Sequence, residues 1–128
     1  MASVTHSFMK LKIFAYKDCD TCRKAIHYLE RQGIPFEVIP IREQPPALDE
    51  LMRMLCIYNG AIRKLFNTSG QDYKTMDLKS KLPKMSEKEA LDLLAKHGNL
   101  VKRPFLLMKN RGVVGFKEDE WKMLLKHG

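Results

Sequence analysis

The chain has 128 residues, 45% of them hydrophobic, which suffices for one domain with its own core and makes a disulfide framework of its three cysteines unnecessary. The net charge of +8 is compatible with an acidic partner, but the basic residues are spread along the chain without a nucleic-acid-binding signature. No stretch is apolar for the length of a membrane span, and residues 1–10 lack an apolar signal segment. We therefore expect a cytoplasmic protein that binds neither membranes nor nucleic acid directly.

The first part of the chain predicts a βαβ unit. Residues 1–10 are polar and irregular and are expected to be a disordered lead-in, after which residues 11–16 predict a short buried strand. A helical face follows at the i, i+3, i+4, i+7 spacing, and Gly33 supplies a stop; the face comprises Cys22, Ala25, Ile26 and Leu29. Residues 35–41 predict a second strand, parallel to the first.

A helix is predicted next, with Pro46 at its first position. Its apolar stripe comprises Leu48, Leu51, Met52 and Leu55. Cys56 adjoins this stripe and is expected to be a buried small hydrophobe.

Further helices are predicted before the chain returns to strands. Residues 67–70 indicate a loop, and a short helix is expected over about 71–80. Ser86 and Glu89 have the spacing of a capping box, which opens a helix that Gly98 would end. Its inward face comprises Ala90, Leu91 and Leu94.

The last part of the chain predicts a hairpin and a helix. Residues 105–108 and 113–116 form two strands joined by a turn at 109–112, and an amphipathic helix with Trp121, Leu124 and Leu125 follows. The element order is β-α-β, then helices, then β-β-α. We therefore predict an α/β protein with a thioredoxin-like fold, one domain over residues 1–128, and an all-helical insertion over about 45–98.

The pair Cys19 and Cys22 lies between the first strand and its helix, the usual place for reversible thiol–disulfide chemistry. Unpaired amide N–H groups at the helix N-terminus favour a thiolate there. Cys19 is expected to be the exposed nucleophile and Cys22 the resolving thiol. Nearby basic residues should help to stabilise the thiolate, and nearby acidic ones oppose it; these are Lys17, Arg23, Lys24, Asp18 and Asp20.

Two other interpretations of the cysteine pair remain open. The cysteines could be inert packing residues, or they could contribute to a zinc site. Zinc usually needs four ligands, and only Cys56 and four histidines without ligand spacing remain to complete the set. We predict no metal site.

Arg103 and Pro104 precede the third predicted strand. A proline at this position is tolerated as a strand start, because no ladder hydrogen bond is lost there. Alternatively, the Arg103–Pro104 bond is cis and faces the dithiol, with Arg103 presenting its cation to a thiolate or substrate.

Four segments make the chain resemble the arsenate reductase-like (ArsC/Spx) family. They are CDTCRKA at 19–25, LVKRP at 100–104, VGFKEDE at 114–120, and LFNTSG at 65–70 with Tyr73. The resemblance strengthens the prediction of the ArsC type of thioredoxin fold. It implies that Cys19 is the nucleophile and Arg103 an anion-binding arginine. The other two arginine positions of the arsenate reductases fall on Asn67 and Phe116, with Arg63 near the first.

The resemblance and the residues together predict a thiol–disulfide oxidoreductase. Cys19, Cys22, Arg103 and Pro104 are the predicted catalytic residues, and the predicted substrate-binding residues are Arg23, Asn67 and Arg63. No cofactor is expected, and glutathione with glutaredoxin, or thioredoxin, would restore the dithiol. The alternative is an Spx-like redox-sensing regulator that binds the RNA polymerase α subunit. Arsenate reduction ranks third, because two of three arginine positions lack a positive charge.

Overall fold

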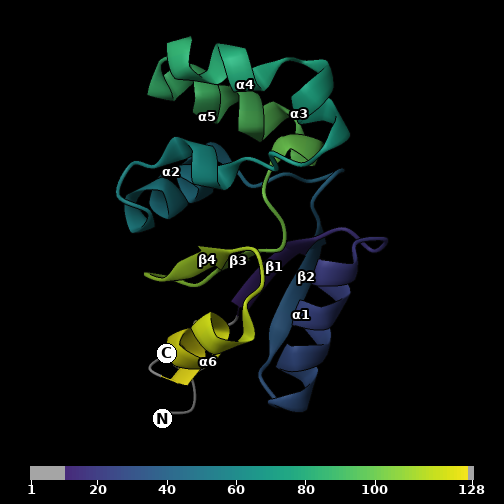
Figure 1. The fold of residues 1–128 in the computed structure, drawn as a ribbon. Coiled ribbons are helices and arrows are strands. Elements are labelled where there is room, and N and C mark those ends of the chain that lie inside the picture. The colour runs from purple at the N-terminus through teal and green to yellow at the C-terminus, as the bar shows by residue number, and fades with distance from the viewer. Residues whose placement is uncertain (1–10, 127–128) are drawn as a thin grey trace.

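The computed structural model describes residues 11–126, which form a four-stranded sheet with helices on both faces (Figure 1). The strand order is β2-β1-β3-β4. Strand β1 (Leu11–Ala15) pairs in parallel with β2 (Phe36–Pro40) and antiparallel with β3 (Phe105–Leu107), which continues into β4 (Gly112–Val114). The predicted βαβ unit and hairpin are confirmed, although β4 begins at Gly112, which was predicted to lie in the turn, and ends at Val114 rather than at residue 116. The predicted lead-in 1–10 lies outside the described residues.

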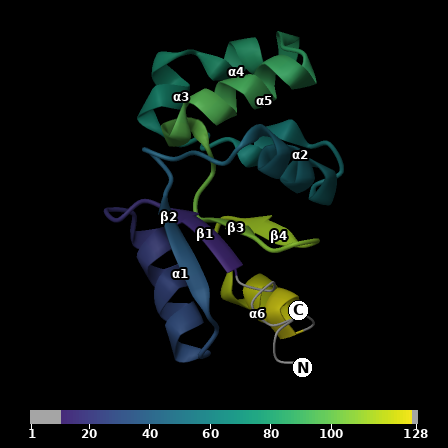
Figure 2. The same ribbon diagram turned by 180° about the vertical axis from the view of Figure 1, so that it is seen from behind.

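The two faces of β1 build two separate hydrophobic clusters. Leu11, Ile13 and Ala15 join a cluster with the buried faces of α1 (Asp20–Arg31) and α6 (Glu118–Lys126). Phe14 points to the opposite cluster, which belongs to the helical insertion. This alternation follows from the two-residue repeat of a strand. The ribbon views agree that α1 and α6 cover one face and α2 the other (Figures 1 and 2).

The segment between β2 and β3 is helical, as predicted. It contains α2 (Leu48–Ile57), η2 (Ile62–Leu65), α3 (Gln71–Thr75), α4 (Leu78–Lys81), η3 (Leu82–Lys84), α5 (Glu87–Lys96) and η4 (Gly98–Leu100). The capping box of Ser86 and Glu89 opens α5, with both of its hydrogen bonds formed. The inward face of α5 is buried as predicted. The order of elements, β-α-β, then helices, then β-β-α, confirms the predicted thioredoxin-like fold.

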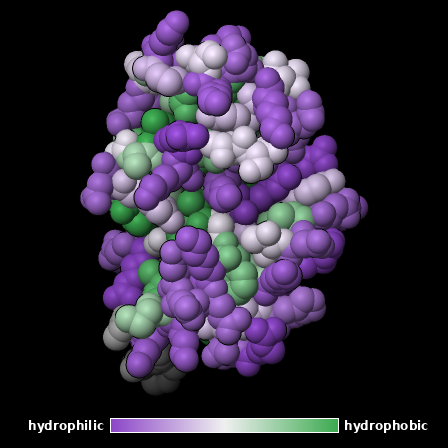
Figure 3. All heavy atoms as spheres, viewed as in Figure 1, coloured by the Kyte–Doolittle hydropathy of each residue, from purple (hydrophilic) through white to green (hydrophobic). Residues whose placement is uncertain are grey.

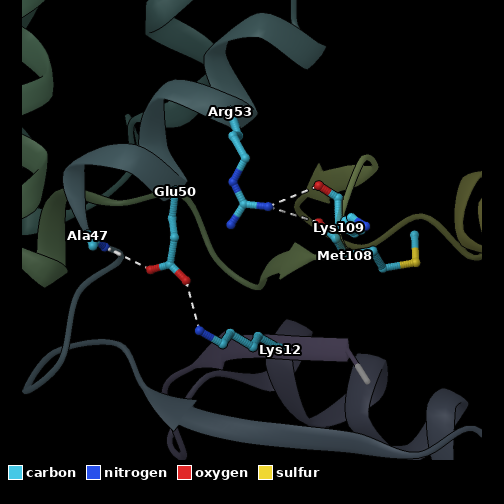
Figure 4. Close-up of polar contacts among 6 residues, drawn as sticks. All are labelled: Lys12, Ala47, Glu50, Arg53, Met108 and Lys109. Atoms are coloured by element: carbon cyan, nitrogen blue, oxygen red, sulfur yellow. Dashed lines mark hydrogen bonds and ion pairs between the residues drawn. The ribbon is translucent and has the colours of Figure 1, made fainter. Parts of the chain in front are cut away.

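Polar contacts anchor α2 on the sheet (Figure 4). The carboxylate of Glu50 lies 3.0 Å from the ammonium of Lys12 on β1 and also accepts the Ala47 backbone N–H at 2.9 Å. Arg53 donates to the Lys109 carbonyl oxygen at 3.0 Å, in the β3–β4 turn. Gly112 permits close packing at the same place, since a Cβ there would lie 2.8 Å from Met54 Cε. The insertion is therefore held to two different strands.

The structure corrects three predictions about α2. Helix α2 begins at Leu48 and not at Pro46, because Ala47 has an extended backbone and Glu50 captures its N–H. Leu48 and Met52 are 40% and 51% exposed, because the helix docks through Leu51, Met54 and Leu55. Cys56 is exposed for the same reason and is not the buried hydrophobe expected.

The single helix predicted over 71–80 is also wrong. Asp77 has a left-handed backbone with φ of 52°, which ends α3 and separates it from α4. Gly98 does not end α5 directly; it follows the last helical residue by two positions. It lies against the backbone just after β2, where a Cβ would be 1.9 Å from the Ile41 carbonyl oxygen.

The surface fits the composition. Hydrophilic residues cover most of the face in Figure 3, and hydrophobic ones reach it in scattered patches. No helix within residues 11–126 combines the length and apolar character needed to cross a membrane.

Candidate functional site

Cys19 occupies the N-cap of α1, as predicted. Its backbone is extended, and its Sγ accepts the N–H of Cys22 at 3.4 Å. The side chain is partly exposed. The sulfur therefore takes one of the unpaired N–H groups of the first turn, where negative charge is favoured.

Cys22 lies in the first turn of α1 and is fully buried. Its neighbours in the hydrophobic cluster include Ala25 and Leu29, and its Sγ accepts the Tyr16 N–H at 3.5 Å. Burial, with smaller effects of the adjacent Cys19, raises the pKa of the Cys22 thiol to about 12. Cys22 is therefore a protonated thiol at neutral pH.

Cys19 shows the opposite behaviour. Its partial burial by itself raises the thiol pKa, but the hydrogen bonds from Cys22, together with the positive charge and the hydrogen bond of Arg103, outweigh burial. The net result is that the pKa of Cys19 is lowered from the ordinary thiol value. Of the two thiols, Cys19 thus has the larger thiolate fraction and is the better nucleophile.

Arg103 and Pro104 lie at the entrance to β3, and the peptide bond between them is cis, as the functional interpretation predicted. The Arg103 guanidinium carbon is 5.2 Å from the ring centroid of Tyr16. Its Nη1 is buried and has no hydrogen-bond partner among residues 11–126. Pro104 is also the residue before β3, and its carbonyl oxygen accepts the Gly115 N–H at 2.8 Å.

A cleft of about 810 Å³ opens beside this arginine. Thr21 of the CxxC segment lines it, together with residues of η2, the segment before β3 and the β4–α6 connection. Its basic residues are Arg63, Lys64, Lys102, Arg103 and Lys117. The cleft therefore carries a concentration of positive charge and reaches the CxxC segment through Thr21, although neither Cys19 nor Cys22 is among its lining residues.

Only one of the three predicted substrate-binding residues lies in the cleft lining. Arg63 lines the cleft, but Arg23 lines a separate pocket of about 350 Å³ between α1 and β2. Arg23 donates to the Lys17 carbonyl oxygen at 2.7 Å and pairs with Asp20. The Asn67 side chain is not in the cleft lining, although both of its neighbours, Phe66 and Thr68, are.

Three residues of the site were not predicted from the sequence: Tyr16, whose N–H donates to the Cys22 sulfur, and the cleft residues Lys102 and Tyr58. The Tyr16 ring faces two guanidinium groups, since the guanidinium carbon of Arg42 is 4.6 Å from its centroid. Tyr16 could have been predicted to belong to the site because it lies next to the CxxC loop in the sequence, and Lys102 because it lies next to Arg103. Tyr58 gave no signal in the sequence. Its hydroxyl accepts the N–H of Val114 on β4 at 3.0 Å, and these two residues are far apart in the chain.

Within the described part of the chain, no three His, Cys, Asp or Glu side chains gather as a metal site would require.

Comparisons with known proteins agree with this arrangement. The sequence model of the ArsC family matches residues 14–124. An uncharacterised protein, YusI of Bacillus subtilis, is 44% identical over 88% of this chain and 96% of its own length. The global transcriptional regulator Spx of Streptococcus mutans is 27% identical over 88% of this chain and 81% of its own. A crystal structure of a putative ArsC family related protein from Bacteroides fragilis superposes with a TM-score of 0.85, with 39% identity over 91% of this chain and 98% of that one.

Proposed function

The chain belongs to the ArsC family, and on this basis we propose that it is a thiol–disulfide redox protein with Cys19 as the nucleophile and Cys22 as the resolving thiol. The observation that carries this proposal is the opposite shift of the two pKa values, lowered at Cys19 and raised to about 12 at Cys22. One thiol is thereby available to attack, and the other is kept protonated until it is needed.

The first step is attack by the Cys19 thiolate on one sulfur of a disulfide. A bond forms between that sulfur and Cys19, the original S–S bond breaks, and the leaving thiolate takes a proton from solvent. Arg103 lies beside Cys19 and can balance negative charge at the reacting sulfurs.

The second step is attack by Cys22 on the Cys19 sulfur, after loss of the Cys22 proton. The mixed disulfide breaks, the second substrate half leaves as a thiolate, and two electrons have passed from the protein to the substrate. The negative charge of Cys19 contributes to the raised pKa of Cys22. Because that charge disappears when Cys19 enters the mixed disulfide, the pKa of Cys22 falls when the second attack is due.

Recycling requires an external dithiol or two thiols. Glutathione with glutaredoxin, or thioredoxin, would reduce the Cys19–Cys22 disulfide with two electrons. Such a cycle fits a cytoplasmic protein, whose surroundings keep thiols reduced.

A trapping experiment tests the proposal. Cys22→Ser should accumulate a mixed disulfide on Cys19 when the reduced protein meets a model disulfide, because the resolving thiol is absent. Cys19→Ser should accumulate no mixed disulfide, and it should lose NADPH-coupled turnover in the presence of glutathione and glutaredoxin. Both variants should carry Cys56→Ser, because Cys56 is exposed and can react independently. Equal turnover of Cys19→Ser and the Cys56→Ser parent would contradict the assigned nucleophile.

The similarity to Spx supports a second candidate function. We propose as the alternative a redox-sensing regulator, in which the same dithiol changes state without turnover and reports it to RNA polymerase. A pull-down with RNA polymerase, using reduced and oxidised protein, tests this alternative. Absence of binding in both states would exclude it.

Arsenate reduction is the third candidate. Among the positions that the resemblance implied, Arg103 lines the cleft, whereas Phe116 lines it without a charge and Asn67 lies outside the lining. We therefore expect arsenate to be a poor substrate in the coupled assay.

A further inference from the structure

We propose that the cleft lined by Thr21 and Arg103 selects small organic disulfides whose thiol halves carry several anionic groups, either carboxylates or phosphates. This inference rests on the proposed thiol–disulfide exchange and names its class of substrate. The exchange itself is the two-step reaction described above, with the disulfide as the oxidant.

The charge of the cleft is strongly one-sided. Five basic side chains line it, contributed by η2, the segment before β3 and the segment before α6, against the single carboxylate of Glu120. The Glu120 carboxylate lies 3.9 Å from the Lys117 ammonium, so these two charges partly cancel and the other four basic side chains have no further acidic residue in the described lining. Within residues 11–126, neither Arg63 nor Lys102 forms an ion pair. Like charges in a hollow raise the local concentration of an anionic ligand.

Arg103 connects this charge to the thiol. The Arg103 side chain hydrogen-bonds the Cys19 sulfur, whereas its buried Nη1 has no hydrogen-bond partner within the described residues, although a buried N–H normally has one. The oxygen of a bound carboxylate or phosphate would supply it. Because Arg103 also lies beside Cys19, and Thr21 lines the same cleft, an anion held here brings its disulfide towards the nucleophile.

The size and lining of the cleft favour an organic molecule. Its volume of about 810 Å³ is that of a site for a drug-sized ligand and exceeds the need of one tetrahedral oxyanion. Aromatic side chains provide surface for carbon groups between the charges; they are Tyr58, Phe66 and Phe116.

The backbone of the cleft lining is fixed near Gly115. Gly115 has φ of 75°, a conformation that favours glycine, and a Cβ there would lie 3.4 Å from Cε of Lys102. The Trp121 indole N–H donates to the Gly115 carbonyl oxygen at 3.0 Å, which fixes the turn that leads to Phe116 and Lys117. The backbone that carries Phe116 and Lys117 is therefore held in place by the fold.

Rates of thiol exchange with a charge series test the proposal. The reduced Cys56→Ser protein would be mixed with glutathione disulfide, coenzyme A disulfide, neutral 2-hydroxyethyl disulfide and cationic cystamine. We expect at least one of the two anionic disulfides to react about tenfold or more faster than the neutral one at low salt, with the preference shrinking as salt rises. A preference for coenzyme A disulfide indicates phosphate recognition, and one for glutathione disulfide indicates carboxylate recognition.

Matched variants separate the cleft from net charge. Arg63→Gln with Lys102→Gln should reduce the anionic-to-neutral rate ratio about tenfold, whereas Lys79→Gln with Lys81→Gln removes the same charge from exposed α4 and should keep the ratio. Equal ratios in all proteins, or no anionic preference in the parent, overturn this inference alone. Absence of exchange with every disulfide, the neutral one included, instead overturns the proposed function.

Discussion

The two thiols of the CxxC segment are three positions apart and yet have very different environments. Cys19 is partly exposed at the N-cap, beside Arg103, while Cys22 is buried in the first turn of α1. We predict that iodoacetamide alkylates Cys19 with a pH midpoint below that of an ordinary thiol. Cys22 should stay unmodified in the native protein, because burial raises its pKa to about 12.

The measurement is the rate of alkylation against pH in the Cys56→Ser protein, with the modified residue identified by peptide mass spectrometry. Unfolding in urea serves as the control, since both thiols should then react at the same midpoint. Alkylation of Cys22 before Cys19 in the native protein would contradict the assigned roles.

Tyr16 gives a second prediction for single residues. Its ring lies 5.2 Å from the Arg103 guanidinium carbon, and its hydroxyl donates to Asp18 at 3.0 Å. We infer that Tyr16 is a positioning residue that holds Arg103 beside Cys19. Tyr16→Leu should raise the alkylation midpoint of Cys19 by about half a pH unit, the equivalent of one cation–π contact. Tyr16→Phe retains the ring and should restore the midpoint; a shift shared by both variants would contradict this role.

For whole elements, the contact between α2 and the sheet is open to test. Glu50 is largely buried and serves both Lys12 and the Ala47 N–H, whereas the Lys12 side chain is half exposed. Glu50→Ala should lower the free energy of unfolding by about 1–3 kcal/mol, because a helix N-terminal hydrogen bond and an ion pair are lost together. Lys12→Met should cost about 1 kcal/mol or less, because only a partly exposed ion pair is lost. Urea unfolding measures both, and the reverse ranking would contradict this account of how α2 is anchored.

Sequence periodicity predicted most elements correctly because their signals are local. The spacing of apolar residues gave α1 and α5, and the Ser86–Glu89 box marked where α5 begins. Local signals failed where the neighbours decide. Asp77 breaks the predicted helix with a left-handed backbone, and α2 turns Met52 outward because the sheet and α5 accept a different face.

The candidate site divides in the same way across the whole molecule. Cys19, Cys22 and the Arg103–Pro104 bond were recognised from short motifs. The cleft was not, because its lining comes from α1, the end of α2, η2, the approach to β3 and the β4–α6 connection. Those segments meet only when the insertion packs on the sheet. Lys102, for example, becomes part of a charged cleft only through that packing.

The free energy of unfolding of the whole protein should depend on the buried Cys22 thiol at alkaline pH. The folded state raises the pKa of Cys22 from the ordinary value of 9.0 to about 12, so its thiol contributes to stability in full below pH 9. As pH rises above 9, the unfolded chain gains by losing this proton and the folded chain does not, so the contribution decreases until pH passes the folded pKa. Cys19 has the opposite sign: its lowered pKa favours the folded state above the ordinary thiol pKa, and this benefit is lost as pH falls through the folded value.

Comparison with Cys22→Ala, with Cys19→Ser in both proteins, isolates the Cys22 contribution, because the coupled Cys19 thiol is then absent and lysines and tyrosines titrate in both. At pH 7 the variant should be the less stable one, since it leaves a cavity under α1. Between pH 9 and pH 10 the difference in free energy of unfolding should shrink by about 1 kcal/mol. Urea unfolding under reducing conditions at several pH values measures this difference. Parallel curves across that range would mean that the native environment does not hold the proton on Cys22, contrary to the raised pKa of its thiol.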